Sequence, residues 1–130
     1  MSDIIIAISY MIIAIDPVSK PRMTQSDRWR SRPCTQKYWD FKNRLKLLYG
    51  NNQVPESLHL IFTIQIPKSW SNKKRLTMTG KPHQSKPDID NLIKAFLDAL
   101  LDDDAHVWDI RATKIWGTSG SIEVRDLTQG

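Results

Sequence analysis

The stretch 86-KPDIDNLIKAFLDALLDDDAHVWD-109 carries the clearest structural signal in this 130-residue chain. Apolar residues recur in it at helical spacing, at positions 89, 92, 93, 96, 97, 100 and 101, which is the pattern of an amphipathic helix with one buried face. Asp88, directly after Pro87, stands where a helix N-cap is expected. We therefore predict a helix over residues 89–101 that packs its apolar face on the core.

The same stretch is also strongly acidic. It contains seven of the fourteen acidic residues, all of them Asp, in a chain whose net charge is +5. A purely structural interpretation accounts for some of them. Asp88 would cap the first turn, Asp90 would complement the helix dipole, and Asp90, Lys94 and Asp98 would form a ladder of i,i+4 ion pairs worth roughly a few tenths of a kcal/mol each.

That interpretation does not explain Asp102, Asp103 and Asp104, because the C-terminal end of a helix favours cations. Asp carboxylates suit hard divalent ions such as Mg²⁺ or Mn²⁺, whereas the scattered histidines and the single cysteine provide no zinc site. Side chains two positions apart in a helix diverge by about 200°. Asp88 and Asp90 can therefore converge on an ion only if Asp88 lies outside the helix.

Basic residues are concentrated in two segments. Nine of the nineteen lie between Lys20 and Lys46, and six more lie between Lys68 and Lys86. Two basic segments suggest a polyanionic partner such as nucleic acid, although a solvated basic surface is an equally simple explanation. The predicted phosphate contacts are Arg22, Arg28, Arg30, Arg32, Lys73, Lys74 and Arg75.

The N-terminal apolar run, Ile4 to Ile15, predicts a buried strand because it is rich in β-branched residues. It is too short to span a bilayer, and it follows Asp3 rather than the basic region of a signal peptide. We expect a cytoplasmic protein with no membrane segment.

Further elements follow from capping residues and periodicity. Residues 16–35 are predicted to form a loop, and Thr35 is predicted to cap a helix that ends at Tyr49, before Gly50. The inner face of that helix would carry Tyr38, Phe41, Leu45 and Leu48.

The rest of the chain predicts strands and a second loop. Alternation over residues 58–66 indicates a half-buried strand, and residues 68–86 indicate a basic loop with one short helical turn. Strands over 107–116 and 121–124 flank Gly117–Gly120, which predicts a closing hairpin. The order β-α-β-α-β-β indicates a single α+β domain over residues 1–130, with a mixed or mainly antiparallel sheet backed by two helices.

The acidic stretch also resembles a known family signature. KPDIDNLIKAFLDAL (86–100) followed by DDAHV (103–107) is similar to the motif of the RusA family of Holliday-junction resolvases, which is K/R-x-D-x-D-N-x-x-K, then D-A-L, then D-D-x-x-V. The segment PVSKPRMTQ (17–25) also resembles the proline-rich basic loop of phage members. Family members usually have a short glycine-containing turn between D-A-L and D-D, and Leu101–Asp102 replaces it here.

The resemblance implies a homodimeric, Mg²⁺-dependent endodeoxyribonuclease that nicks four-way DNA junctions symmetrically during recombination and repair. It assigns Asp88, Asp90 and Asp104 as metal ligands and Lys94 as a catalytic lysine, with Asp103 as the third ligand if the helix ends early. Two other interpretations remain open. One is a non-catalytic dimeric DNA-binding module with a structural divalent ion, and the other is a metal-dependent phosphatase acting on a small phosphate ester.

Overall fold

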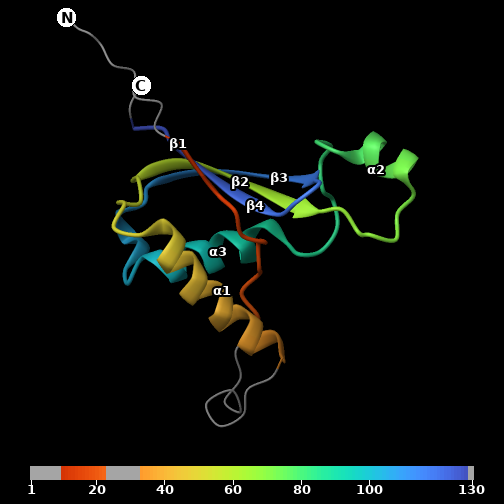
Figure 1. The fold of residues 1–130 in the computed structure, drawn as a ribbon. Coiled ribbons are helices and arrows are strands. Elements are labelled where there is room, and N and C mark those ends of the chain that lie inside the picture. Colours follow the sequence, from red (N-terminus) through yellow and green to blue (C-terminus); the bar gives the residue numbers. More distant parts are fainter. Residues whose placement is uncertain (1–9, 23–32, 129–130) are drawn as a thin grey trace, which may run out of the picture.

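The computed structural model describes residues 10–22 and 33–128, which form one mixed sheet and the helices packed beside it (Figure 1). The strands are β1 (Tyr10–Ile13), β2 (Ser57–Gln65), β3 (Asp109–Gly117) and β4 (Ser121–Asp126). The helices are α1 (Pro33–Tyr49), α2 (Asn72–Met78) and α3 (Ile89–Leu100), followed by the short 3₁₀ helix η2 (Asp104–His106). This architecture confirms the predicted α+β class.

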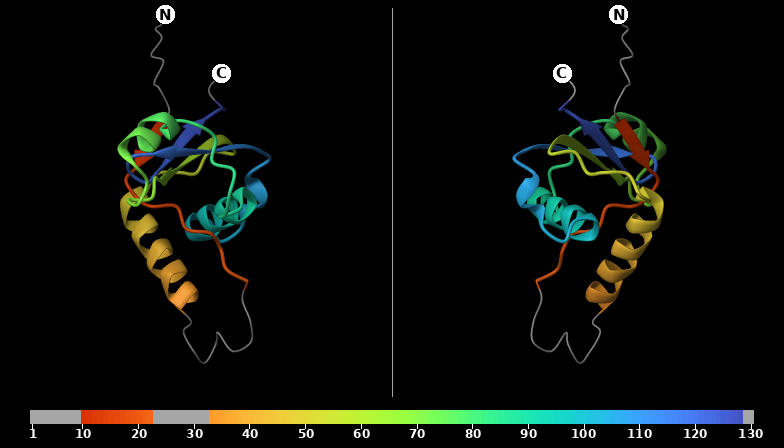
Figure 2. Two further views of the ribbon diagram at one scale, coloured as in Figure 1. Left: turned by 90° about the vertical axis from the view of Figure 1, so that its right-hand side faces the viewer. Right: turned by 90° about the vertical axis from the view of Figure 1, so that its left-hand side faces the viewer.

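Helices α1 and α3 cover the same face of the sheet, as both views of Figure 2 show, and the core lies between them and the strands. Leu45 of α1, Phe96 of α3 and Leu60 of β2 are fully buried there. The prediction of α3 was correct to within one residue, because its apolar stripe is wide and continuous. Helix α2 is different, since it projects from one end of the sheet and buries none of its residues.

The predicted hairpin between the last two strands is wrong. The strand order is β1-β4-β2-β3, so β2 separates β3 from β4. β3 runs parallel to β2, and β4 runs antiparallel to it on the other side. The turn over residues 117–120 therefore crosses the end of β2 instead of joining neighbouring strands. A Cβ on Gly117 would overlap Thr63 of β2, so a glycine is needed at this crossing.

Two predictions near the N-terminus need correction. β1 is an edge strand with Tyr10 and Ile12 exposed, and not a buried strand, because only one of its faces meets the helices; residues 1–9 lie outside the described part. Helix α1 begins at Pro33, and its last inward residue is Tyr49, while Leu48 is 45% exposed. The stop at Gly50 is confirmed by its positive φ of 65°.

In the described ranges, no helix is long and apolar enough to cross a membrane.

Candidate active site

A cleft of about 910 Å³ opens where the N-terminus of α3 meets the middle of β3. Its walls include Asp88 and Asp90 from the start of α3, Lys114 from β3, and His83 and Lys86 from the segment that leads into α3. Two of the predicted metal ligands therefore share one cavity with three basic side chains, which places groups of opposite charge on the same cleft.

Asp88 lies outside the helix, as its predicted role requires. It occupies the N-cap position with an extended backbone (φ −70°, ψ 143°), but its side chain makes no capping hydrogen bond. Instead, Lys86 Nζ donates to both carboxylate oxygens, at 2.9 Å and 2.8 Å. This hydrogen bond, with smaller contributions from the charges of Lys86 and Lys114, holds the pKa of Asp88 below its usual value. Asp88 is thus ionised at neutral pH and available to a cation.

Asp90 lies in the first turn of α3, is exposed and lines the same cleft. Mg²⁺ in proteins is commonly held by one or two carboxylates, with water and substrate phosphate completing its shell. The two aspartates fit such an ion in number and in donor type. Among the residues that the structure describes, however, no group of three or more His, Cys, Asp or Glu side chains is placed to hold a metal.

Lys94 lies one turn further along α3 and is exposed. The i,i+4 ladder that would have occupied it is absent, because Asp98 accepts hydrogen bonds from Lys20 Nζ at 2.6 Å and from Tyr38 OH at 3.3 Å. Within residues 10–22 and 33–128, the Lys94 ammonium takes part in no ion pair. Its charge is therefore available to an anionic ligand.

Asp104 lies at the opposite end of α3 from Asp88 and Asp90. A helix of 12 residues is ~18 Å long, and Asp104 follows its last residue by a few positions. Trp108, just beyond, is bonded through its backbone N–H to Glu56 O at 3.0 Å, which fixes this segment beside the start of β2. Within a single chain, Asp104 therefore does not reach the cleft that Asp88 and Asp90 line.

Asp103, the alternative third ligand, has a local structural role. Its side chain accepts a hydrogen bond from the backbone N–H of Ala105 at 2.9 Å and so caps η2. Asp103 and Asp104 thus stand at the beginning of a new helical turn, where anions are favourable. Acidic residues directly after α3 are unfavourable because the C-terminal end of a helix favours cations, and the new turn of η2 partly offsets this cost.

Lys114 was not identified by sequence reasoning. Lys114 lines the cleft, and its ammonium donates to the backbone carbonyls of Ser85 and Pro87, both at 2.6 Å. A signal was present in the sequence, because the inward positions of β3 are Ile110, Ala112, Lys114 and Trp116, and a lysine breaks that apolar series.

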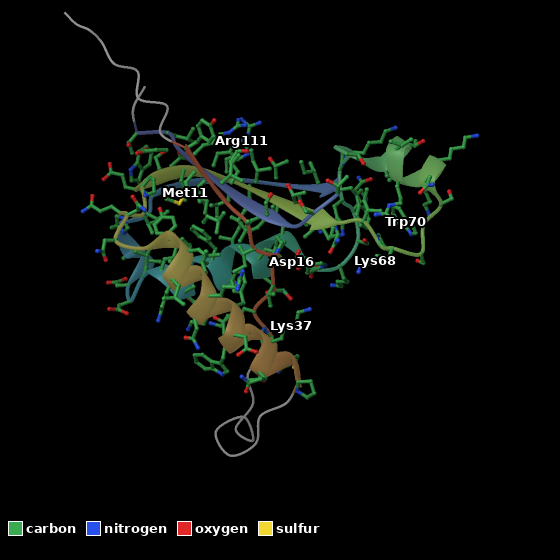
Figure 3. The ribbon with its side chains drawn as sticks, viewed as in Figure 1. Met11, Asp16, Lys37, Lys68, Trp70 and Arg111 are labelled. Carbon is green, nitrogen blue, oxygen red and sulfur yellow. The ribbon has the colours of Figure 1, made fainter. Side chains whose placement is uncertain are left out.

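The second basic segment forms an arm around α2. Lys73 and Lys74 are exposed on this helix, and Arg75 is half-buried. Trp70, labelled in Figure 3, lies at the base of the arm. Its ring packs on Trp116 with centroids 4.8 Å apart and so anchors the arm to β3. Lys74 Nζ lies 4.0 Å from the centre of the Trp70 ring.

The first basic segment is described only in part. Residues 14–22 form an N-terminal strap that crosses α3, where Lys20 N–H donates to Asn91 O at 3.1 Å. Arg22 is exposed at the end of this strap. The predicted contacts Arg28, Arg30 and Arg32 lie outside the described residues.

Comparison with known protein families identifies the family of the chain. A family model described as "Endodeoxyribonuclease RusA" matches residues 14–125 of the 130-residue chain. The matched region includes the cleft, the α2 arm, β2, β3 and all of β4 except Asp126, and it begins directly after β1. Among curated proteins, no sequence matches the chain.

Proposed function

The chain belongs to the endodeoxyribonuclease RusA family, and from this premise we propose that it is a Mg²⁺-dependent nuclease that cuts four-way DNA junctions at the cleft beside α3. Members of this family are Holliday-junction endonucleases and generally need a divalent metal. The observation that carries the proposal is the joint position of Asp88 and Asp90 on one cleft, with Asp88 turned away from its capping role.

Asp88 and Asp90 would hold the ion, with Mn²⁺ as a possible substitute for Mg²⁺. The bound metal would activate water and stabilise the charge that develops on the phosphorus-bound oxygens. Asp88 would exchange its present partner, the Lys86 ammonium, for the ion, which frees Lys86 to approach a phosphate. Both aspartates are exposed, so a DNA backbone can reach them without rearrangement of the core.

Lys94 would act on the phosphate itself. Its ammonium is exposed and unpaired within the described residues, on the helix whose first turn carries Asp90. A cation placed near the scissile phosphate stabilises the transition state by donating to a non-bridging oxygen or to the leaving oxygen as charge develops.

We further propose that the enzyme works as a homodimer, because paired nicks in a four-way junction require two sites related by symmetry. The position of Asp104 supports this. Since Asp104 and Asp90 lie at opposite ends of α3, Asp104 can assist at a cleft only if it comes from the second protomer. Asp103 is a weaker candidate for the third ligand, because its carboxylate already caps η2.

The basic arm and the N-terminal strap would hold the junction. Lys73, Lys74, Arg75 and Arg22, together with Arg28, Arg30 and Arg32, would contact phosphates, which fix the position of DNA without recognising its sequence. The cellular role would be the resolution of branched DNA formed during recombination and repair.

The test is cleavage of a synthetic four-way junction, with linear duplex of the same sequence as the control. We expect paired symmetric nicks in Mg²⁺ and none in EDTA. Junction binding without nicking in any divalent metal would favour the DNA-binding module instead. Release of inorganic phosphate from a small phosphate ester, with the junction left intact, would favour the phosphatase.

A further inference from the structure

Lys114 occupies an unusual place for a charged residue. On β3 it pairs with Phe62 of β2, whose side chain is 1% exposed and faces the helices. Residues paired across two strands point to the same face of a sheet, so Lys114 also points toward the helices. It is half-buried there.

The ammonium of Lys114 donates two hydrogen bonds to one short segment of backbone. It donates to Ser85 O and to Pro87 O, both at 2.6 Å. The backbone carbonyl of Lys114 also accepts a hydrogen bond from His83 N–H at 3.0 Å. One residue of β3 therefore fixes the segment 83–87 at three points, and Asp88 is the next residue along the chain.

An inward-pointing lysine on an edge strand has a simple alternative explanation, since such charges prevent another strand from pairing with the edge. The edge of β3 does not need this protection. Residues 80–83 already pair with it, through Gly80 N–H to Trp116 O at 2.8 Å and Trp116 N–H to Lys81 O at 2.9 Å. The contacts of Lys114 instead lie just before the start of α3, beside the cleft that Ser85 and Lys114 line.

We propose that Lys114 is a positioning residue for cleavage: it holds the carbonyls of Ser85 and Pro87 so that the Asp88 carboxylate faces the cleft. This inference rests on the proposed function, since it assigns Lys114 a task only if Asp88 acts there. Lys114 itself is not a catalytic residue, because two of its three N–H donors are committed to backbone.

The experiment compares Lys114→Met, which keeps the length of the side chain and removes the ammonium, with Arg111→Met. Arg111 is an exposed basic residue on the same strand, and three positions along a strand place it on the opposite face, as Figure 3 shows. Both variants lose one positive charge, so a difference in cleavage between them depends on where the charge lies and not on net charge alone.

We expect Lys114→Met to bind the junction in EDTA within about threefold of wild type and to cleave it ~10²-fold more slowly under single-turnover conditions, because misplacement of a reacting group by about 1 Å costs that much. Deuterium uptake of peptides covering residues 83–92 should also be faster. Arg111→Met should match wild type in cleavage and in deuterium uptake. Wild-type cleavage and wild-type uptake in Lys114→Met would overturn the proposal.

A second variant covers the case in which Lys114→Met does not fold. Lys114→Arg keeps a cation that can donate to both carbonyls, so we expect it to cleave within about tenfold of wild type, by the same positional argument. Loss of cleavage in Lys114→Arg with unchanged uptake over residues 83–92 would contradict the positioning role.

Failure of this inference is distinguishable from failure of the proposed function. If Asp90→Asn abolishes cleavage while Lys114→Met cleaves and exchanges as wild type does, only the role of Lys114 is wrong. If Asp90→Asn still cleaves, the cleft is not the active site, whatever Lys114 does.

Discussion

The charged side chains along α3 do not simply pair with their neighbours on the same helix. Asp98 is held by Lys20 and Tyr38 and not by Lys94, its neighbour on the same helix. Burial, and then the charge of Asp98 and the hydrogen bond to it, raise the pKa of Tyr38 to about 12, so this hydroxyl remains a donor at every physiological pH. The arrangement ties the N-terminal strap to α3 and leaves the Lys94 ammonium available.

The availability of Lys94 leads to a prediction at the same scale. Lys94→Ala should melt at nearly the wild-type temperature, because an exposed lysine without an ion pair contributes well under ~1 kcal/mol to stability. Its cleavage rate should fall by ~10² or more, since a transition-state contact is lost. Thermal melting and single-turnover kinetics on one preparation check both parts. Near-normal cleavage with a lowered melting temperature would assign Lys94 a structural role.

Some site residues could be predicted from sequence and others could not, for a physical reason. Asp88 and Asp90 were identifiable because their chemistry and their placement around a helix start are local properties. The break that Lys114 makes in the apolar series of β3 marks it as unusual, but its role could not be predicted, because its partners are the backbone carbonyls of Ser85 and Pro87, 29 and 27 residues away. The distance of Asp104 from the cleft depends on where α3 ends and how the chain continues.

Among the secondary-structure elements, helices were predicted better than strand pairing. The 3.6-residue periodicity of α3 fixes both its existence and its buried face. The glycine-containing turn over residues 117–120 indicates a reversal, but a reversal does not specify which strand lies between its two arms. Here the apolar β2 occupies the centre of the sheet, paired on both edges. The place of β4 in the sheet, between β1 and β2, could be assigned only from the tertiary structure.

The crossover at Gly117 can be tested by substitution. Gly117→Ala should destabilise the protein by ~1–3 kcal/mol, because the added methyl group overlaps Cγ2 of Thr63 in a packed region. Thr63→Ser removes that Cγ2 and should recover part of the loss in the double variant. Urea denaturation of the wild type, the two single variants and the double variant measures the coupling free energy between the two positions. Strict additivity of the two substitutions would show that the chain does not cross β2 at this point.

The α2 arm is an element whose function depends on charge rather than packing, since it buries none of its residues. If a dimer neutralises roughly six to ten phosphates, affinity for a junction should fall ~10³–10⁵-fold between about 50 and 200 mM salt. Replacing Lys73, Lys74 and Arg75 together by Gln should flatten the salt dependence by about one unit per lost contact. Salt titrations of binding in EDTA measure this slope. An unchanged slope would remove α2 from the DNA surface.

At the scale of the whole molecule, the separation of Asp90 and Asp104 raises the question of whether a cleft uses Asp104 from the same chain or from the partner chain. We expect a heterodimer of one Asp90→Asn chain and one Asp104→Asn chain to nick one strand of each junction, although either homodimer is inactive. In that heterodimer one cleft combines Asp90 from one chain with Asp104 from its partner, and the other cleft lacks both. Two differently tagged chains, purified together and assayed for nicks per junction, provide the measurement. An inactive heterodimer would mean that both aspartates act from the same chain.

The most direct test of the proposed active site is DNA cleavage by Asp90→Asn. Junction binding is measured on the same preparation, and Asp40→Asn serves as the control. Asp40 is exposed on α1, away from the cleft, and its substitution removes the same charge. We predict that Asp90→Asn loses Mg²⁺-dependent cleavage by ~10² or more, because a metal ligand is gone. It should bind the junction as tightly as wild type or more so, because less negative charge opposes DNA. Full cleavage by Asp90→Asn would contradict the assignment of this cleft as the active site.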